Sequence, residues 1–256
     1  MPKAFPQRDD LRFDDGVVVR RHDLVALDTV AWIHRLLDRL AFNAPKPVPY
    51  FDGASVALID GIVWSALSYV EGEVVGWSRE PAMFELGAFL ASFHDAAAAV
   101  EMDAQQSPVY SIDAVAPAGH AARVRHVIHG DPTNHNVLAC GSPARACGII
   151  DFGNACIEVP LFDIGCALWR SGRPAQHVHE FDPRRIAAYI DGYGSVHPLS
   201  RDDRVAVVGY LRARGEQIMA KQAARGVRDD GPRRKLDWLD RYEERLVGAL
   251  LQHGSS

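Results

Sequence analysis

Two short polar segments carry the residues of this sequence best suited to chemistry. The first is His129-Gly130-Asp131-Pro132-Thr133-Asn134-His135-Asn136, and the second is Ile149-Ile150-Asp151-Phe152-Gly153. Asp131 could meet an attacking hydroxyl group. The side-chain oxygens of Asn136 and Asp151 could bind magnesium, which needs few protein ligands beside water and substrate phosphates. An acid at the hydroxyl and two magnesium ligands are the parts that phosphoryl transfer requires, because positioning and charge neutralisation do most of that catalysis.

The sequence between the two segments predicts how they meet. Residues 137–140 are apolar and predict a short strand, 141–143 contain glycine and proline and predict a turn, and 146–150 predict a returning strand. An antiparallel hairpin brings its two open ends together. Asn136 and Asp151 should therefore lie at the same end, where one ion could contact both.

Each motif alone has a structural explanation. His-Gly-Asp is common in turns because glycine and aspartate favour them, and an isolated Asp-Phe-Gly is a weak signal. The order of the two motifs, their separation and the hairpin predicted between them favour a functional site.

The two motifs together resemble those of the aminoglycoside phosphotransferases and related small-molecule kinases, which share the protein-kinase-like fold. The chain has the family's His-Gly-Asp at 129–131 and its metal loop, Ile-Asp-Phe-Gly-Asn, at 150–154. Residues 160–165 are similar to the family's Pro-x-x-Asp-Leu-Ala, and 86–94 resemble the helix that precedes its catalytic loop. The resemblance extends from Val17 to Arg170 and is strongest over 126–166.

The resemblance implies an α+β, bilobal fold: a small antiparallel β lobe at 1–70, shortened, and a larger, mainly helical lobe at 71–256. It also implies ATP and Mg²⁺, with Asp131 catalytic and Asn136 and Asp151 as metal ligands. Asp163 would support the catalytic loop through backbone hydrogen bonds. We expect His129 to pack and hydrogen-bond beneath that loop rather than transfer protons.

The adenine base would lie, by position, against the backbone of the last small-lobe strand and the hinge, from Ser68 through Val70 to Glu71. Leu138 and Ile150 are possible apolar walls of this nucleotide site. Ordinary core packing explains these two residues equally well.

The elements that must position these residues are visible in the pattern. Residues 11–20 predict a hairpin with an Asp-Gly turn, 24–40 a helix that ends before the proline-rich 45–49, and 56–60 and 62–70 two further strands. Glu71-Gly72 predicts a hinge. Beyond Glu80 the pattern is helical apart from the catalytic hairpin. Two segments, Gly172-Arg173-Pro174 and Gly192-Tyr193-Gly194, are expected to break helices.

The small lobe departs from the family pattern. Arg20 stands where a lysine usually pairs the α- and β-phosphates; since neighbouring strand residues face opposite sides, only Arg20 or Arg21 can face the nucleotide, and we favour Arg20. Asp28 is the nearest acidic partner for it. No glycine-rich phosphate loop precedes Val17, so we expect a lobe shortened by roughly a strand pair and weaker nucleotide affinity.

Composition sets further limits. A chain of 256 residues with 48% hydrophobic content can bury a large core, and the net charge of −5 disfavours nucleic acid as a partner. The four cysteines, none in a CxxC pair, predict buried, reduced thiols of a cytoplasmic protein. No signal peptide or membrane span is expected. A zinc site at His126, His129 and His135 is disfavoured by their spacing.

The acceptor is left open. We expect a small molecule with a hydroxyl group, possibly cationic, such as an aminoglycoside-like or other amine-bearing antibiotic, which would make the protein a resistance enzyme. Acidic residues that could contact an amine lie towards the carboxy terminus: Glu158, Asp182, Asp191, Asp202, Asp203, Asp229, Asp230, Asp237, Asp240, Glu243 and Glu244. A metabolite kinase of the choline, sugar or amino-alcohol type and a nucleotide-binding pseudokinase are the alternatives. The oligomeric state is not predicted.

Overall fold

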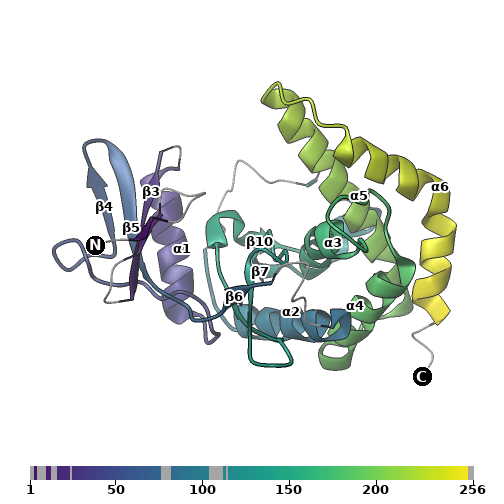
Figure 1. The fold of residues 1–256 in the computed structure, drawn as a ribbon, viewed down its shortest axis with the longest axis horizontal. Helices are drawn as coiled ribbons and strands as arrows, with labels where there is room; N and C mark the ends of the chain where they lie inside the picture. The colour runs from purple at the N-terminus through teal and green to yellow at the C-terminus, as the bar shows by residue number, and fades with distance from the viewer. Residues whose placement is uncertain are drawn as a thin grey trace.

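A computed structural model describes residues 3–4, 10–12, 16–23, 25–75, 82–103, 112–113 and 115–252. A β-sheet with one helix forms one end of the molecule, and a larger group of helices forms the other, with β6 and its neighbours between them (Figure 1). The expected α+β class is confirmed. The lobe boundary at 70/71 stays a prediction.

The N-terminal sheet has five antiparallel strands in the order β1-β2-β3-β5-β4. They are β1 (Lys3–Ala4), β2 (Asp10–Arg12), β3 (Val17–His22), β4 (Val56–Ile59) and β5 (Ile62–Ser68). We expected roughly a strand pair to be missing before Val17. This was wrong, because two strands precede Val17: β2 pairs with β3 as the first arm of the hairpin predicted over 11–20, and β1 pairs with β2.

The alternation of β3 decides which arginine faces inward. Val17 and Val19 are buried with Ala66 on one side of the sheet. Val18 and Arg20 point the other way and line a cavity, whereas Arg21 is exposed and pairs with Asp23.

The helix predicted over 24–40 is α1 (Leu27–Arg39). Its buried face includes Trp32, Leu36 and Leu37, which join the main core. The helix ends at Arg39, well before the prolines, and Leu40 already has an extended backbone. Asp28 is exposed in the first turn, and Arg20 pairs with Asp151, so the Arg20–Asp28 ion pair that we considered is not formed.

The remaining strands surround the two motifs. The chain passes through Gly72 into β6 (Glu73–Val74), which pairs with β8 (Val137–Cys140), and β8 pairs with β9 (Arg145–Ile149). The hairpin predicted between the two motifs is thus confirmed. A further small sheet, in which β7 (His126–Ile128) pairs with β10 (Cys156–Glu158), was not predicted. Its strands have three residues each, too few to show a periodicity.

Five α-helices of the described residues build the C-terminal part. They are α2 (Met83–Ala98), α3 (Pro160–Ser171), α4 (Pro183–Val196), α5 (Arg201–Ala224) and α6 (Gly231–Gln252), with short 3₁₀ turns η1 (His120–Ala122) and η2 (Phe152–Asn154). Phe93, Phe162, Tyr193 and Tyr210 are among the largest fully buried side chains of the core between them.

Glycines let these helices approach one another. Gly172 ends α3 as expected, but Gly192 and Gly194 lie inside α4, so the predicted break there was wrong. A Cβ atom at Gly192 would lie 1.8 Å from the carbonyl oxygen of Phe84, and one at Gly87 would lie 1.9 Å from that of Tyr189. These glycines are required for the close contact of α2 with α4, not for a turn.

The Gly192→Ala variant is expected to lose about 2 kcal/mol of unfolding free energy, since overpacking a tight contact typically costs ~1–3 kcal/mol. Gly194→Ala is the matched control in the same helix. The nearest atom to its Cβ would be an Arg204 nitrogen at 3.4 Å, so stability should be unchanged or slightly raised by helix propensity. Denaturant unfolding measures both variants, and equal losses would contradict the packing explanation.

Candidate active site

The loop after β7 is held by one buried carboxylate. Asp163, in the first turn of α3, is fully buried, and its two oxygens accept hydrogen bonds from the backbone N–H groups of His129 (2.8 Å) and Gly130 (2.7 Å). His94 of α2 lies 3.1 Å from the same carboxylate through Nε2 and 2.8 Å from the Tyr193 hydroxyl through Nδ1. The loop is therefore tied to three core helices.

Both ring nitrogens of His129 are occupied. Nε2 lies 2.9 Å from the carbonyl oxygen of Ile150, and Nδ1 accepts the backbone N–H of Asp131 at 3.2 Å. These partners require the neutral ring with its proton on Nε2. His129 is completely buried and links the loop of Asp131 to that of Asp151.

Gly130 lets the two loops pass each other. Its φ is +79°, and a Cβ atom there would lie 2.1 Å from the carbonyl oxygen of Asn154. A residue with a side chain would be strained and would also collide, so the glycine of the His-Gly-Asp motif is required by both backbone and space.

Asp131 and Asn136 meet directly. The Asn136 amide nitrogen donates to the carbonyl oxygen of Asp131 at 2.9 Å and to its carboxylate at 3.2 Å. The Asn136 amide oxygen is buried and has no hydrogen-bond partner in the part of the chain that the structure describes. The Asp131 side chain is 25% exposed and so remains within reach of a substrate.

Asp151 stands across the hairpin from Asn136. The backbone N–H of Ile150 donates to the carbonyl oxygen of Asn136 at 2.8 Å, so the two strands bring the residues to the same end. Asp151 has φ +67°, in the left-handed region that glycine adopts most readily and, among other residues, asparagine and aspartate adopt most often. Its carboxylate lies 2.9 Å from Arg20 of β3, which connects the N-terminal sheet to the hairpin.

Arg20 and Asp151 line a cavity of about 650 Å³ between the N-terminal sheet, α1 and the hairpin. Ser68, Val70, Leu138 and Ile150, the residues expected around a nucleotide, line the same cavity. Its volume falls in the range typical of small-molecule and cofactor sites.

The α1 wall of this cavity carries a histidine that the sequence reading did not single out. His34 is buried, its Nδ1 lies 2.9 Å from the Ser55 hydroxyl, and its Nε2 has no hydrogen-bond partner within the described ranges. Burial, with a smaller effect from nearby His22, lowers the pKa of His34 to about 4. The ring is therefore neutral at pH 7.

Arginines on distant helices complete the surroundings of Asp131. Arg214 of α5 donates to the Asp131 carboxylate at 2.9 Å and to Gln217 at 2.6 Å. Burial lowers the pKa of Arg170, in the last turn of α3, and the charge of Asp131 opposes this shift; its Nε is buried and has no hydrogen-bond partner among the described residues. Neither arginine was predicted from the sequence. Arg214 lies 83 residues from Asp131 along the chain, and no local pattern marks such a contact.

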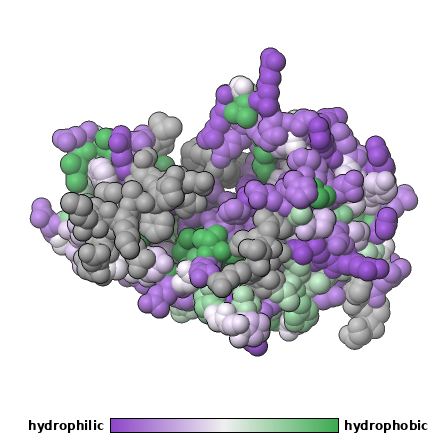
Figure 2. Space-filling model, viewed as in Figure 1, coloured by the Kyte–Doolittle hydropathy of each residue, from purple (hydrophilic) through white to green (hydrophobic). Residues whose placement is uncertain are grey.

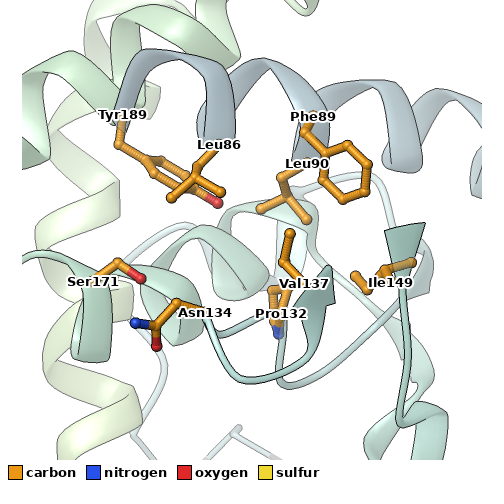
Figure 3. A pocket seen from close by; sticks show the side chains of 9 residues that line it. All are labelled: Leu86, Phe89, Leu90, Pro132, Asn134, Val137, Ile149, Ser171 and Tyr189. Atoms are coloured by element: carbon orange, nitrogen blue, oxygen red, sulfur yellow. The ribbon is translucent and has the colours of Figure 1, made fainter. Parts of the chain in front are cut away.

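A second, very small cavity of about 10 Å³ lies between the loop at Pro132 and Asn134 and the helices α2 and α4. Figure 3 shows Asn134 beneath it, with Ser171, Leu86 and Tyr189 on the facing elements. Asn134 is buried, and neither end of its amide has a hydrogen-bond partner among the described residues. The volume suits a single water molecule, which would satisfy the amide.

The carboxy-terminal acids mostly have structural partners. Asp182 caps α4, Asp191 pairs with Arg204 at 2.8 Å, and Asp203 forms the capping box of α5 while it pairs with Arg123. On α6, the acidic and basic residues beyond Lys235 form an exposed face. The face visible in Figure 2 is mainly hydrophilic over α5 and α6.

No group of three or more His, Cys, Asp or Glu side chains in the described ranges is arranged to hold a metal ion. None of the helices described is both long and apolar enough to cross a bilayer. All four cysteines are free thiols; Cys156 and Cys166 are buried as expected, but Cys140, at the end of β8, is exposed.

Known proteins with similar sequences are kinases. Residues 99–201 match the model of the phosphotransferase enzyme family. A homoserine kinase of Rhizobium etli is 26% identical over 214 residues, which cover 71% of this chain and 63% of that protein. A homoserine kinase of Methylobacillus flagellatus is 34% identical over 90 residues, 34% of this chain and 26% of the relative. The chain thus matches less than two thirds of the length of either relative.

Solved structures show the same fold over almost the whole chain. A microcompartment-associated aminopropanol kinase superposes with a TM-score of 0.67 at 16% identity, covering 100% of this chain and 94% of the other. The amicoumacin kinase hAmiN, solved with AMP-PNP, Ca²⁺ and Ami, gives 0.66 at 14% identity, covering 96% and 88%.

Proposed function

We propose that the protein transfers the γ-phosphate of ATP to a hydroxyl group of a small molecule. Residues 99–201 match the phosphotransferase enzyme family, and the chain shares its fold with a solved small-molecule kinase. The observation that carries the proposal is the convergence of Asp131, Asn136 and Asp151 at the end of one hairpin, beside a cavity of about 650 Å³.

Asp131 is the catalytic residue in this proposal. Its carboxylate accepts a hydrogen bond from the acceptor hydroxyl and aims the oxygen at the γ-phosphorus. A bond forms between that oxygen and phosphorus, the bond to the β–γ bridging oxygen breaks, and ADP leaves. The hydroxyl proton passes to Asp131 late and then to solvent. Because a carboxylate is a weak base for an alcohol, orientation is the larger part of its role.

Asn136 and Asp151 are the proposed ligands of Mg²⁺. The buried, unpaired amide oxygen of Asn136 supports this, since a buried acceptor without a donor is costly and a hard cation would satisfy it. The carboxylate of Asp151 supplies the second oxygen, and its contact with Arg20 would be rearranged when phosphates enter. The ion would neutralise charge on the phosphate oxygens.

The large cavity is the proposed nucleotide site. Leu138 and Ile150 would flank the adenine base, with the backbone from Ser68 to Val70 as its hydrogen-bonding edge, and Arg20 would bind a phosphate. No glycine precedes Gly16, so the nucleotide phosphates would depend on Arg20 and the metal ion. We therefore expect weak ATP binding in the absence of magnesium.

For the acceptor, we propose a chemical class rather than a single compound. An aminoglycoside-like or other amine-bearing antibiotic is one candidate, and antibiotic resistance would be its role. The structural partners of Asp182, Asp191 and Asp203 weaken it, because these acids are already used. A metabolite kinase is the second candidate, favoured by homoserine kinases among the curated relatives. We place the protein in the cytoplasm, with no nucleic-acid or membrane partner.

The test is magnesium-dependent ADP release with a panel of aminoglycosides, amino alcohols, hydroxy acids and sugars, with phosphate monoester formation followed by ³¹P NMR. The proposal expects at least one acceptor to stimulate ADP release and to gain a monoester signal in equal amount. Nucleotide binding without transfer to any member of the panel would favour the pseudokinase alternative instead.

A further inference from the structure

Each oxygen of the Asp131 carboxylate has a donor from a different part of the fold. The Asn136 amide of the hairpin donates to one oxygen at 3.2 Å, and Arg214 of α5 donates to the other at 2.9 Å. A carboxylate that is fixed at both oxygens cannot turn about its last side-chain bond without losing a hydrogen bond. The side chain is still 25% exposed, so its remaining lone pairs are open to a substrate.

Arg214 is itself held in place. It is only 12% exposed, and its second terminal nitrogen donates to the side-chain oxygen of Gln217, one turn further along α5, at 2.6 Å. A guanidinium group is planar, keeps its charge and presents its donors in fixed directions. The contact with Gln217 therefore sets the plane of the guanidinium, and Asp131 receives a donor of fixed direction.

Two glycines fix the place of α5 against α3. A Cβ atom at Gly165 of α3 would lie 2.7 Å from the backbone of Tyr210 in α5. A Cβ atom at Gly215, the residue after the arginine, would lie 2.5 Å from the Trp169 ring of α3. The first turn of α3 also carries Asp163, which holds the catalytic loop by its backbone. The loop and the helix that carries the arginine are thus both fixed relative to α3.

Arg214 stands apart from the nucleotide cavity. The described residues that line this cavity come from the N-terminal sheet, α1, the hinge, the hairpin and the loops beside it, and α5 contributes none of them. Loss of the arginine should therefore leave ATP binding unaltered and affect the step in which Asp131 takes part.

Resting on the function proposed above, we propose that Arg214 is a positioning residue for phosphoryl transfer. It holds the Asp131 carboxylate in the orientation that receives the acceptor hydroxyl, and its charge offsets that of the carboxylate beside the phosphates. It acts through Asp131 and exchanges no proton. Such positioning matters because a displacement of about 1 Å can cost about 10²-fold in rate.

The test is a double-mutant cycle on Arg214 and Asp131. ADP release from ATP and Mg²⁺ is measured with water in place of the acceptor hydroxyl. Arg214→Gln should lower kcat by about 10²-fold and leave KM for ATP unchanged. In the Asp131→Ala background the same substitution should cost nothing further, because the group through which the arginine acts is absent. A purely structural role predicts the same fold-loss in both backgrounds, and that result would overturn the inference.

Arg212→Gln is the matched control on the same helix. Arg212 pairs with Glu243 of α6 at 2.7 Å, so its loss weakens the contact between α5 and α6, and turnover should be unchanged. An equal loss of turnover in this control would assign the effect to helix packing and reject the positioning role. If Arg214→Gln does not fold, Arg214→Lys decides. Lysine keeps the charge but lacks the planar fork, so kcat should fall, and the loss should again vanish in the Asp131→Ala background.

Failure of this inference is distinct from failure of the proposed function. ADP release by the wild-type chain, with independent losses in the cycle, would overturn the positioning role alone. A wild-type chain that releases no ADP with water or with any member of the acceptor panel would contradict the proposed function, and this inference with it.

Discussion

Replacing Asp131 with alanine is expected to lower kcat by about 10²–10⁴-fold, the range that a positioned acid–base group contributes. The substituted chain would no longer orient the acceptor hydroxyl or accept its proton. Folding should survive, because the side chain is partly exposed and the loop is held through backbone groups by Asp163. Steady-state ADP release measures the loss, and circular dichroism and thermal unfolding verify the fold.

Two further variants make this result interpretable. Asp131→Asn keeps a hydrogen-bonding side chain of the same size but not its charge, and we expect a loss close to that of alanine. Asp237→Asn removes an exposed carboxylate of α6 that pairs with Arg233, and turnover should be unchanged. Unchanged turnover in Asp131→Ala would remove this residue from the chemistry.

The second large effect is expected on stability. Asp163→Ala should lower the free energy of unfolding by about 3–5 kcal/mol, as breaking a buried charge interaction does, because two backbone N–H groups and His94 lose their acceptor. Native domains are stable by only ~5–15 kcal/mol, so much of the margin would disappear. Urea unfolding followed by fluorescence measures the difference.

Asp163→Asn is the matched comparison at this position. The amide retains one oxygen acceptor and the shape of the side chain, so the loss should be clearly smaller than for alanine. Hydrogen exchange at the His129 and Gly130 amides should increase in both variants, and most in alanine. Equal stability of Asp163→Ala and wild type would show that the loop is held in another way.

Local pattern was sufficient for the centre of the site. The strand at 137–140, the turn after it and the return to Ile149 follow from apolar runs and from glycine and proline, and they alone place Asn136 beside Asp151. The two-residue period of β3 allowed only one of Arg20 and Arg21 to face inward, and the motif position favoured Arg20, which lines the cavity.

Contacts between distant segments were beyond the sequence pattern. Arg214 reaches Asp131 from a helix whose position depends on the packing of α3 with α5. Gly192 was interpreted as a helix breaker because glycine has low helix propensity; its role in the contact with α2 depends on a residue more than a hundred positions away. The first arm of the hairpin predicted over 11–20 is β2, whereas β1 was missed because only two described residues form it.

The roles of Asn136 and Asp151 are tested most directly by the coupling between metal and nucleotide. AMP-PNP is titrated calorimetrically into the wild-type chain and into Asp151→Asn, with and without Mg²⁺. We predict that Mg²⁺ strengthens AMP-PNP binding to wild type by tenfold or more and that Asp151→Asn loses most of this gain. Equal nucleotide affinity with and without Mg²⁺, or the same gain in the variant, would contradict the phosphoryl-transfer site.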